Sequence, residues 1–253
     1  MNKNLKNNDS FFVYGIQPVI ELLKSNHSVE NVIIAKETDA KVKNRIINLA
    51  KNRNLSVESI SKQYVQRYTG PVLHQGVVAK LNAYQYINEK FLFTELLKSE
   101  NVLILILDEI QDPHNVGAII RTAEIAGATC IILPEKGSAP INSTVAKTST
   151  GAVFHIPIHQ TNDLYLLIEE LKSNKIQIIA AEEGQQNNLF KSDIPSKIAL
   201  IIGSEGKGVR KNLKKLADKN ISIPQFGKVN SLNASVSAAV ILYEIVRQRN
   251  FKD

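Results

Sequence analysis

The chain has 253 residues, 43% of them apolar, which is enough to bury a core in one large or two small domains. No run approaches the roughly 18 continuous apolar residues of a membrane-spanning helix. The polar start MNKNLKNNDS lacks the apolar region of a signal peptide, so we expect a cytoplasmic protein. The single cysteine, Cys130, cannot form an internal disulfide, and its apolar neighbours predict a buried strand residue.

The net charge is +7, and its distribution is uneven. Residues 1–98 carry 14 Lys and Arg against 8 Asp and Glu, whereas residues 99–253 carry 17 against 16. A basic N-terminal part is typical of a protein that binds a polyanion such as RNA, although lysines that only solvate a small domain give the same count. The five histidines show no metal-ligand spacing, so no metal site is expected.

Hydrophobic periodicity divides the chain into two parts. After an Asn- and Lys-rich segment, 1–10, that is expected to be disordered, residues 11–83 read as a small alternating α/β domain. Residues 84–100 are the predicted linker, with a short helical pattern in FLFTELLKS. The predicted elements of the first domain are a helix in IQPVIELLKS, a strand in NVIIA, a helix in AKVKNRIINLAKNRN, and strands in LSVESI and QGVVAKL.

Residues 101–253 alternate regularly between apolar strands and amphipathic helices. This pattern predicts a parallel sheet covered on both faces, with ligands at the carboxyl ends of its strands. Its predicted strands are VLILIL, CIIL, HIPIH, IQIIAAE, KIALIIG and ISIP, and the last predicted helix is ASVSAAVILYEIVRQRN.

The first polar cluster follows the strand VLILIL. Asp112 and Pro113 interrupt the chain, Asn115 can cap the next helix, and Arg121 lies inside that helix among Ile and Ala. The planar guanidinium suits a phosphate or a carboxylate, and an ion pair with Asp112 or Glu124 is the structural alternative.

The second cluster, GSEGKG at 203–208, has three glycines directly after a strand. Its spacing matches neither a dinucleotide-binding fingerprint nor a P-loop, and Glu205 would repel phosphates. The loop therefore better suits a neutral or cationic ligand.

The third cluster, NSLNAS at 230–235, precedes the last helix. Helix capping needs one Ser or Asn, so the surplus polar groups indicate a polar ligand. Because all three clusters follow strands of one predicted sheet, they describe one composite site.

In order and spacing, the three clusters resemble the motifs of the SpoU/TrmH family of RNA ribose 2′-O-methyltransferases in the SPOUT superfamily. The motifs are N-x-G-x-x-x-R (115–121), G-S-E-G-x-G (203–208) and S-L-N-x-S (231–235). YGIQPVIELLKS and LHQGVVAKL resemble that family's substrate-binding domain, so the likeness covers nearly the whole chain. Within the family, the sequence is most similar to bacterial enzymes that methylate a guanosine in the peptidyl-transferase region of 23S rRNA.

The resemblance implies a knotted fold, in which the C-terminal parallel sheet carries a trefoil knot that bends S-adenosylmethionine into its loops. It also implies a homodimer through the last helix, with the active site completed across subunits. Carried over by position, the residues implied in cofactor binding are Gly203, Ile223, Ser231 and Leu232. Those implied in catalysis are Asn115, Arg121, Glu205 and Asn233.

The implied reaction needs alignment of a ribose 2′-oxygen and an acceptor for its proton. Guanidinium stays protonated in proteins, so we expect Arg121 to hold the target phosphate rather than act as a base. RNA selection is expected of the N-terminal domain, with tyrosines such as Tyr14, Tyr64 and Tyr68 as possible stacking groups. Two alternatives remain open: a tRNA ribose 2′-O-methyltransferase, and a non-enzymatic ribosome-assembly or RNA-binding protein with the same fold.

Overall fold

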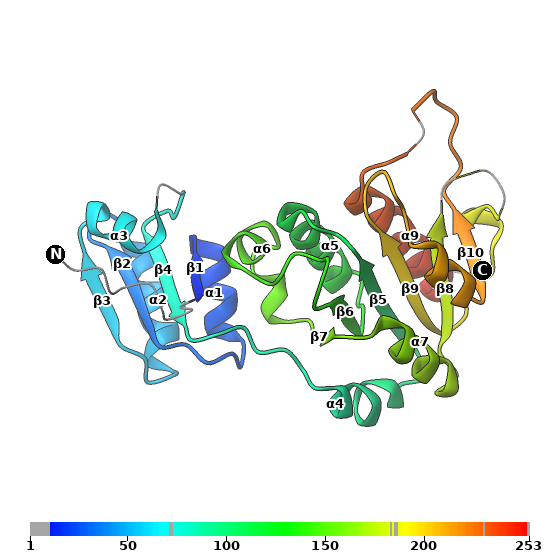
Figure 1. Ribbon diagram of the computed structural model, residues 1–253. Helices are drawn as coiled ribbons and strands as arrows, with labels where there is room; N and C mark the ends of the chain where they lie inside the picture. The colour runs from blue at the N-terminus through cyan, green and yellow to red at the C-terminus, as the bar shows by residue number, and fades with distance from the viewer. Residues whose placement is uncertain (1–10, 71–72, 183, 185–186, 230, 252–253) are drawn as a thin grey trace. The chain divides into compact units, whose positions relative to one another are not determined.

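The computed structural model describes residues 11–70, 73–182, 184, 187–229 and 231–251 (Figure 1). The expected disorder of 1–10 and the motif residue Asn230 lie outside this part of the chain. The chain forms two compact units. The first comprises Met1–Gln85 and Ile141–His155, and the second comprises Tyr86–Pro140 and Ile156–Asp253. No helix in the described part is long and apolar enough to cross a bilayer.

The first unit is built on a mixed sheet with the strand order β1-β4-β2-β3. β4 pairs antiparallel with β1 and with β2, whereas β2 and β3 are parallel. Its elements are β1 (Phe11–Tyr14), α1 (Ile16–Lys24), β2 (Asn31–Ala35), α2 (Ala40–Lys51), β3 (Val57–Ile60), α3 (Lys62–Thr69) and β4 (Val77–Leu81). The sequence predicted α1, α2, β2, β3 and β4, but it missed β1 and α3.

Among the side chains of helix α3 that the structure describes, Val65 packs on the sheet. The helix sequence KQYVQRYT is mostly polar, and Val65 joins Ile33, Ala35 and Val78 in a small core. The helix is short and mostly polar, so reading the sequence for apolar runs does not find it.

Residues 141–155 belong to the first unit, although the sequence placed all of 101–253 in one domain. They contain α6 (Ser143–Thr148) and the short 3-10 helix η2 (Ala152–Phe154). The Ser143 hydroxyl donates to the carbonyl of Phe12, and the Tyr84 hydroxyl donates to the carbonyl of Val153 at 2.8 Å. The periodicity of the segment predicts its helix but carries no information about these long-range contacts.

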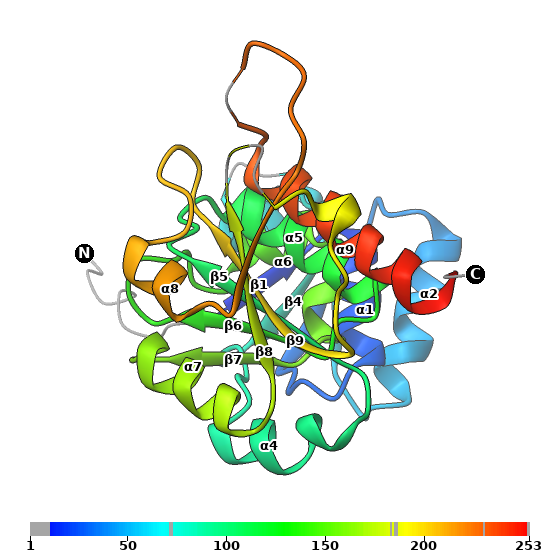
Figure 2. The same ribbon diagram turned by 90° about the vertical axis from the view of Figure 1, so that its right-hand side faces the viewer.

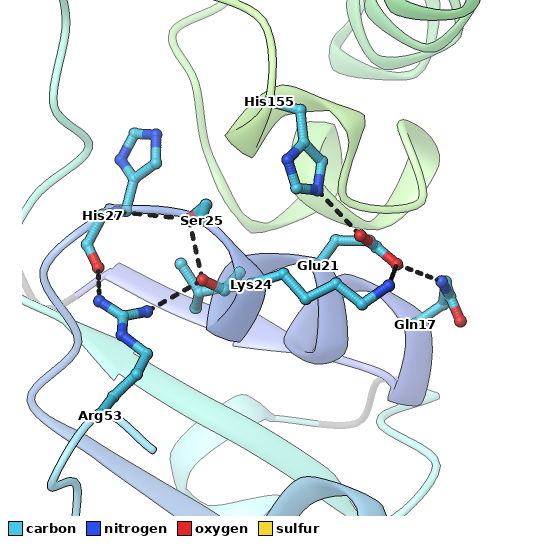
Figure 3. A network of polar contacts seen from close by, with 8 residues as sticks. Gln17, Glu21, Lys24, Ser25, His27, Arg53 and His155 are labelled. Atoms are coloured by element: carbon cyan, nitrogen blue, oxygen red, sulfur yellow. Dashed lines mark hydrogen bonds and ion pairs between the residues drawn. The ribbon is translucent and has the colours of Figure 1, made fainter. Parts of the chain in front are cut away.

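The carboxylate of Glu21 on α1 also binds this segment (Figure 3). Its Oε2 lies 2.8 Å from Nε2 of His155, and its Oε1 accepts from Gln17 at 2.6 Å and Lys24 at 2.9 Å. Burial alone would raise the pKa of Glu21, but the hydrogen bonds and charges of Lys24 and His155 outweigh it and lower that pKa. The Arg53 guanidinium stabilises the nearby turn by donating to the carbonyls of Leu22 and His27.

The second unit is built on a sheet with the strand order β10-β8-β9-β5-β6-β7, and every pair of neighbours is parallel, as predicted. Its strands are β5 (Val102–Asp108), β6 (Cys130–Pro134), β7 (Ile158–Thr161), β8 (Gln177–Glu182), β9 (Lys197–Gly203) and β10 (Lys219–Ser222). Its helices are α4 (Glu89–Thr94), α5 (Pro113–Ile125), α7 (Leu164–Ser173), α8 (Lys211–Leu216) and α9 (Ala234–Asn250), with 3-10 turns η1 (Leu96–Lys98) and η3 (Leu189–Lys191).

Helices cover both faces of this sheet. Figure 2 shows α5 and α9 on one side of β5 and β9, with α7 and α8 on the other. Ile104 and Ile106 of β5 face the core that α7 completes, whereas the alternate residues Leu103 and Leu105 are buried on the opposite face. Cys130 is fully buried in β6, as predicted, and burial raises the pKa of its thiol to about 12.

The expected linker 84–100 is for the most part an element of the second unit. Ile87 forms a bridge to His159 of β7, and Leu92 of α4 is fully buried in the core of the large sheet. The predicted helix in FLFTELLKS is present as α4 followed by η1. The prediction of a linker from the mixed composition of this stretch gave too little weight to its apolar residues.

Candidate functional site

The loop that follows β9 turns back tightly on its own strand. The Gly208 N–H donates to the carbonyl of Ser204 at 2.9 Å, and Gly206 and Gly208 have φ values of +78° and +64°. A Cβ atom at Gly203 would lie 2.0 Å from the carbonyl carbon of Gly208. The close return of the backbone therefore requires a glycine at 203, and the positive φ favours glycine at 206 and 208.

Asn233 is the N-cap of α9. Its Oδ1 accepts from the backbone N–H groups of Ser235 at 2.9 Å and Val236 at 3.3 Å, and from the Ser235 hydroxyl. One residue of the third cluster, Asn233, therefore serves as the helix cap, as expected from the need of a helix for one such residue. Ser231 and Leu232 precede the cap and line a pocket.

The side chains of Asn115, Glu205 and Asn233 meet in one hydrogen-bonded group. Asn115 Nδ2 donates to Glu205 Oε1 at 3.1 Å, and Asn233 Nδ2 donates to Asn115 Oδ1 at 3.0 Å and to Glu205 Oε1. Each residue comes from a different cluster, after β5, β9 and β10 respectively. The structure thus brings the three polar clusters together at the carboxyl edge of the sheet, as the sequence predicted.

A cavity of about 140 Å³ lies between the glycine loop and the start of α9. Gly203, Ile223, Ser231 and Leu232, the predicted cofactor residues, all line it, and so does Glu205. Its remaining lining residues are Ala181, Glu182, Ile202, Ser204, Gly206, Lys207, Gly208, Lys214, Ile221, Gln225, Ala234, Ser237 and Ile241. The wall thus combines apolar side chains, backbone of a glycine loop, two carboxylates and two lysines.

A second cavity of about 270 Å³ adjoins the first. The two cavities share Ser204, Glu205 and Lys207 as lining residues. The second is otherwise lined by residues 109–112 after β5 and by Asn115. A ligand in the first cavity and a ligand in the second would therefore meet at the same loop.

Arg121 lies apart from both cavities. It is exposed on α5, six residues after Asn115, and lines neither pocket. Among the described residues, none forms a hydrogen bond or ion pair with Arg121. The alternative of a structural ion pair with Asp112 or Glu124 is therefore not found in the described part of the chain. Asp112 instead caps α5 by accepting from the His114 N–H at 2.8 Å.

Sequence reading missed Asp108 and Arg210, which form an ion pair beside the loop between a fully buried carboxylate and a partly exposed guanidinium. The Asp108 carboxyl accepts from Arg210 Nε at 2.7 Å and from the Arg210 N–H at 2.9 Å. Burial raises the pKa of Asp108 above its ordinary value, although the Arg210 hydrogen bonds and charge act in the opposite direction. A signal was present in the sequence, because a carboxylate ends an otherwise apolar strand and an arginine follows the glycine loop.

Two family models together match most of the chain. The model of the SpoU rRNA Methylase family matches residues 102–243, and that of RNA 2′-O ribose methyltransferase substrate binding matches residues 12–87. With the parallel sheet and the composite site at its carboxyl edge, these matches define the class of protein as an RNA methyltransferase. The chain belongs to the SpoU rRNA Methylase family.

Two bacterial relatives match over nearly their whole lengths. The TrmH family protein YacO of Bacillus subtilis (strain 168) is 38% identical over 241 residues, which are 94% of this chain and 96% of YacO. A TrmH family protein of Staphylococcus saprophyticus is 34% identical over 244 residues, 96% of this chain and 98% of its own length.

Solved structures have the same fold. The SpoU methyltransferase AviRb from Streptomyces viridochromogenes, in complex with AdoMet, superposes with a TM-score of 0.81 at 23% identity, covering 100% of this chain and 96% of AviRb. The TrmH/SpoU tRNA modifying enzyme of A. aeolicus superposes with a TM-score of 0.54 at 31% identity, covering 61% of this chain and 79% of that enzyme.

Proposed function

We propose that this protein transfers a methyl group from S-adenosylmethionine to the ribose 2′-oxygen of a guanosine in the peptidyl-transferase region of 23S rRNA. This is the reaction of the RlmB-type enzymes, which act in the cytoplasm. The observation that carries the proposal is the meeting of Asn115, Glu205 and Asn233 beside a cavity lined by all four predicted cofactor residues.

The lining of the first cavity fits the proposed cofactor. Ile223 and Leu232 offer an apolar surface to a planar base, and the glycine loop exposes backbone groups. Glu182 and Glu205 place carboxylates in the wall that suit a cationic sulfonium, and Lys207 and Lys214 of the same wall place cations that suit the carboxylate of the cofactor. When bound, the cofactor supplies an activated methyl group on a positively charged sulfur.

The residues around the shared wall would orient the ribose. Asn115 and Asn233 hold Glu205 through hydrogen bonds, so its carboxylate has a fixed place at the wall that both cavities share. Arg121 would hold the target phosphate through its guanidinium, which stays charged. This division assigns alignment to Asn115, Glu205 and Asn233, and phosphate binding to Arg121.

The position of Arg121 supports a site completed by a second copy of the chain. An exposed arginine that lines neither cavity of its own chain is available to a partner. Helix α9 carries Val236 and Tyr243, seven residues apart and 47% and 51% exposed, and α5, which packs on α9, carries the exposed Ile125. An apolar stripe of this kind is typical of helix packing between subunits.

The dimer is tested by light scattering coupled to size exclusion. The wild type should elute as a dimer, and the double variant Val236→Glu/Tyr243→Glu should elute as a monomer, because it places charge at the centre of the proposed interface. The matched control is Leu166→Glu on α7, another exposed apolar side chain of the same unit. A monomeric wild type would contradict the proposed dimer.

RNA binding is proposed for the first unit. The match of residues 12–87 to a substrate-binding model and the surplus of basic residues in 1–98 support this assignment. Tyr64 is 53% exposed, whereas Tyr14 packs against the small core of the unit. Nothing is described of the side chain of Tyr68. Tyr64 is therefore the better candidate of the two for stacking on a base.

The substrate is tested directly. Purified protein is incubated with methyl-labelled S-adenosylmethionine and, separately, unmodified 23S rRNA and tRNA, and the labelled nucleoside is identified by mass spectrometry after digestion. We expect 2′-O-methylguanosine from 23S rRNA only. Label in tRNA would favour the second candidate, which the relatives' shared name of tRNA/rRNA methyltransferase keeps open. No label from either RNA would contradict methylation of naked RNA.

A further inference from the structure

The end of β5 and the end of the glycine loop are joined by one ion pair. Asp108 is the last residue of β5, and its side chain is 0% exposed. Arg210 stands two residues after Gly208, at the start of α8. The carboxylate binds both the side chain and the backbone N–H of Arg210, at 2.7 Å and 2.9 Å. The contact thus fixes the backbone at the carboxyl end of the loop, as well as a side chain.

Burial of Asp108 opposes the ionised form that binds Arg210. The pKa of Asp108 is raised in the folded protein by burial, so its ionised form is less favourable there than in the unfolded chain. Its contribution to stability is therefore greatest below the ordinary pKa of an aspartate and is lost as the pH rises through the folded pKa. Because burial opposes the charge of Asp108, the two hydrogen bonds that its carboxylate accepts from Arg210 point to a role in fixing geometry.

The geometry concerned is that of the cofactor cavity. The loop backbone from Gly203 to Gly208 forms one wall of that cavity. At the start of the loop, Gly203 lies against the backbone of Gly208 and Val209, and Val209 is 2% exposed. At the other end the only side chain that binds Asp108 among the described residues is that of Arg210. The loop is therefore closed on itself and attached to β5 at both ends, at its start by the pairing of Gly203 with Asp108 and at its end by Arg210.

Neighbouring groups fix the orientation of the guanidinium. Nη1 of Arg210 lies 3.8 Å from Oε1 of Glu109, and its central carbon lies 5.9 Å from the ring centroid of Tyr165 on α7. Glu109 also lines the second cavity. Arg210 thus interacts with the end of β5, with the residue that follows it and with α7, which a loop residue without a positioning role does not require.

We propose that Asp108 and Arg210 are positioning residues for methyl transfer, which hold the Gly203–Gly208 backbone in the shape that binds the cofactor. This inference rests on the proposed function. It assigns a positioning role to two residues that lie outside the polar clusters and outside the cofactor cavity. It predicts that replacing either residue weakens cofactor binding.

The test is the affinity of the full-length protein for S-adenosylhomocysteine, measured by isothermal titration calorimetry at neutral pH. Asp108→Asn should raise the dissociation constant about tenfold or more, a change that corresponds to one lost charge-assisted hydrogen bond. In methylation assays the loss should appear in the KM for S-adenosylmethionine, with kcat at saturating cofactor within about threefold of wild type. Arg210→Met should resemble Asp108→Asn, whereas Arg210→Lys, which keeps the charge, should recover part of the affinity.

The matched control is Asp218→Asn. Asp218 also accepts one backbone N–H, that of Ile178 at 2.8 Å, and one cation, Lys172 at 3.0 Å, but it lines neither cavity. It should lose thermal stability while its dissociation constant stays within about twofold of wild type. Wild-type affinity in both Asp108→Asn and Arg210→Met would overturn the inference. Absence of binding by the wild type would instead overturn the proposed function.

Discussion

Asn233 has two tasks that a substitution can separate. It caps α9, and it also binds Asn115 and Glu205 at the wall between the two cavities. Asn233→Ala should cost about 1 kcal/mol of stability through the lost cap. It should also lower kcat/KM about tenfold or more, because Glu205 loses a partner. Circular-dichroism melting and a methylation assay measure the two effects.

Asp163 supplies the control for this prediction. It caps α7 by accepting from the N–H groups of Tyr165 at 2.9 Å and Leu166 at 3.1 Å, the same pattern as in Asn233. Asp163→Ala should lose similar stability and keep its activity. If both variants lose activity equally, Asn233 acts only as a cap.

Arg121 should be essential to the reaction but not to the fold. Because its side chain is exposed, Arg121→Met should change stability by no more than about 0.5 kcal/mol. It should lower kcat/KM about a hundredfold through the lost phosphate contact. Arg121→Lys should recover only part of this loss if the guanidinium binds in a bidentate manner. Full activity of Arg121→Lys would show that charge alone is sufficient.

At single positions the sequence was informative where an unusual residue interrupted a regular pattern. Four polar residues where a cap needs one indicated a site, and the structure brings Asn233 and Ser231 to it. Asp108 carried a comparable signal at the end of an apolar strand, but its partner is 102 residues away. No local pattern identifies such a partner, so the pair became visible only in the fold.

Among the elements, the loop after β9 depends most on the size of one residue. A Cβ atom at position 203 would overlap the Gly208 and Val209 backbone, so Gly203→Ala forces the loop to move. We expect a cost of about 1–3 kcal/mol, the usual range for overpacking. The dissociation constant for S-adenosylhomocysteine should rise at least about tenfold, as measured by calorimetry.

Gly127→Ala is the comparison for this variant. Gly127 has a φ of +73°, and no neighbouring atom lies within 4 Å of the place that a Cβ would take, so alanine there introduces backbone strain without a collision. It should cost about 1–2 kcal/mol and leave the affinity unchanged. Unaltered cofactor binding by Gly203→Ala would mean that the loop shape is not needed for the ligand.

The strands and helices of the second unit were predictable because they alternate regularly, although β7 and β10 have only four residues each. β5 is buried throughout, and the parallel sheet follows from alternating apolar strands and amphipathic helices. Two elements of the first unit were not predicted: β1 lies one residue before α1, and the eight residues of α3 are mostly polar. The trefoil knot implied by the family resemblance stays a prediction, because the hydrophobic periodicity of a sequence does not depend on how the chain is threaded.

For the molecule as a whole, RNA binding should depend on salt through the first unit. Helix α2 exposes Lys41, Arg45 and Lys51. If these residues contact phosphates, each change to Ala should lower the slope of log K against log salt by roughly 0.7. Fluorescence anisotropy with a 23S rRNA fragment measures the slope. Lys175→Ala in the second unit, also exposed, should leave it unchanged. Equal slopes in all variants would exclude α2 from the RNA interface.

The membership of residues 141–155 in the first unit has a consequence for synthesis of the protein on the ribosome. The first unit is not contiguous in sequence, since its last segment follows 55 residues that belong to the second. The ion pair of Glu21 therefore cannot form until His155, 134 positions later, has been synthesised. Domains usually fold one after another as they emerge, but here the first unit to emerge cannot be completed until part of the second has been made.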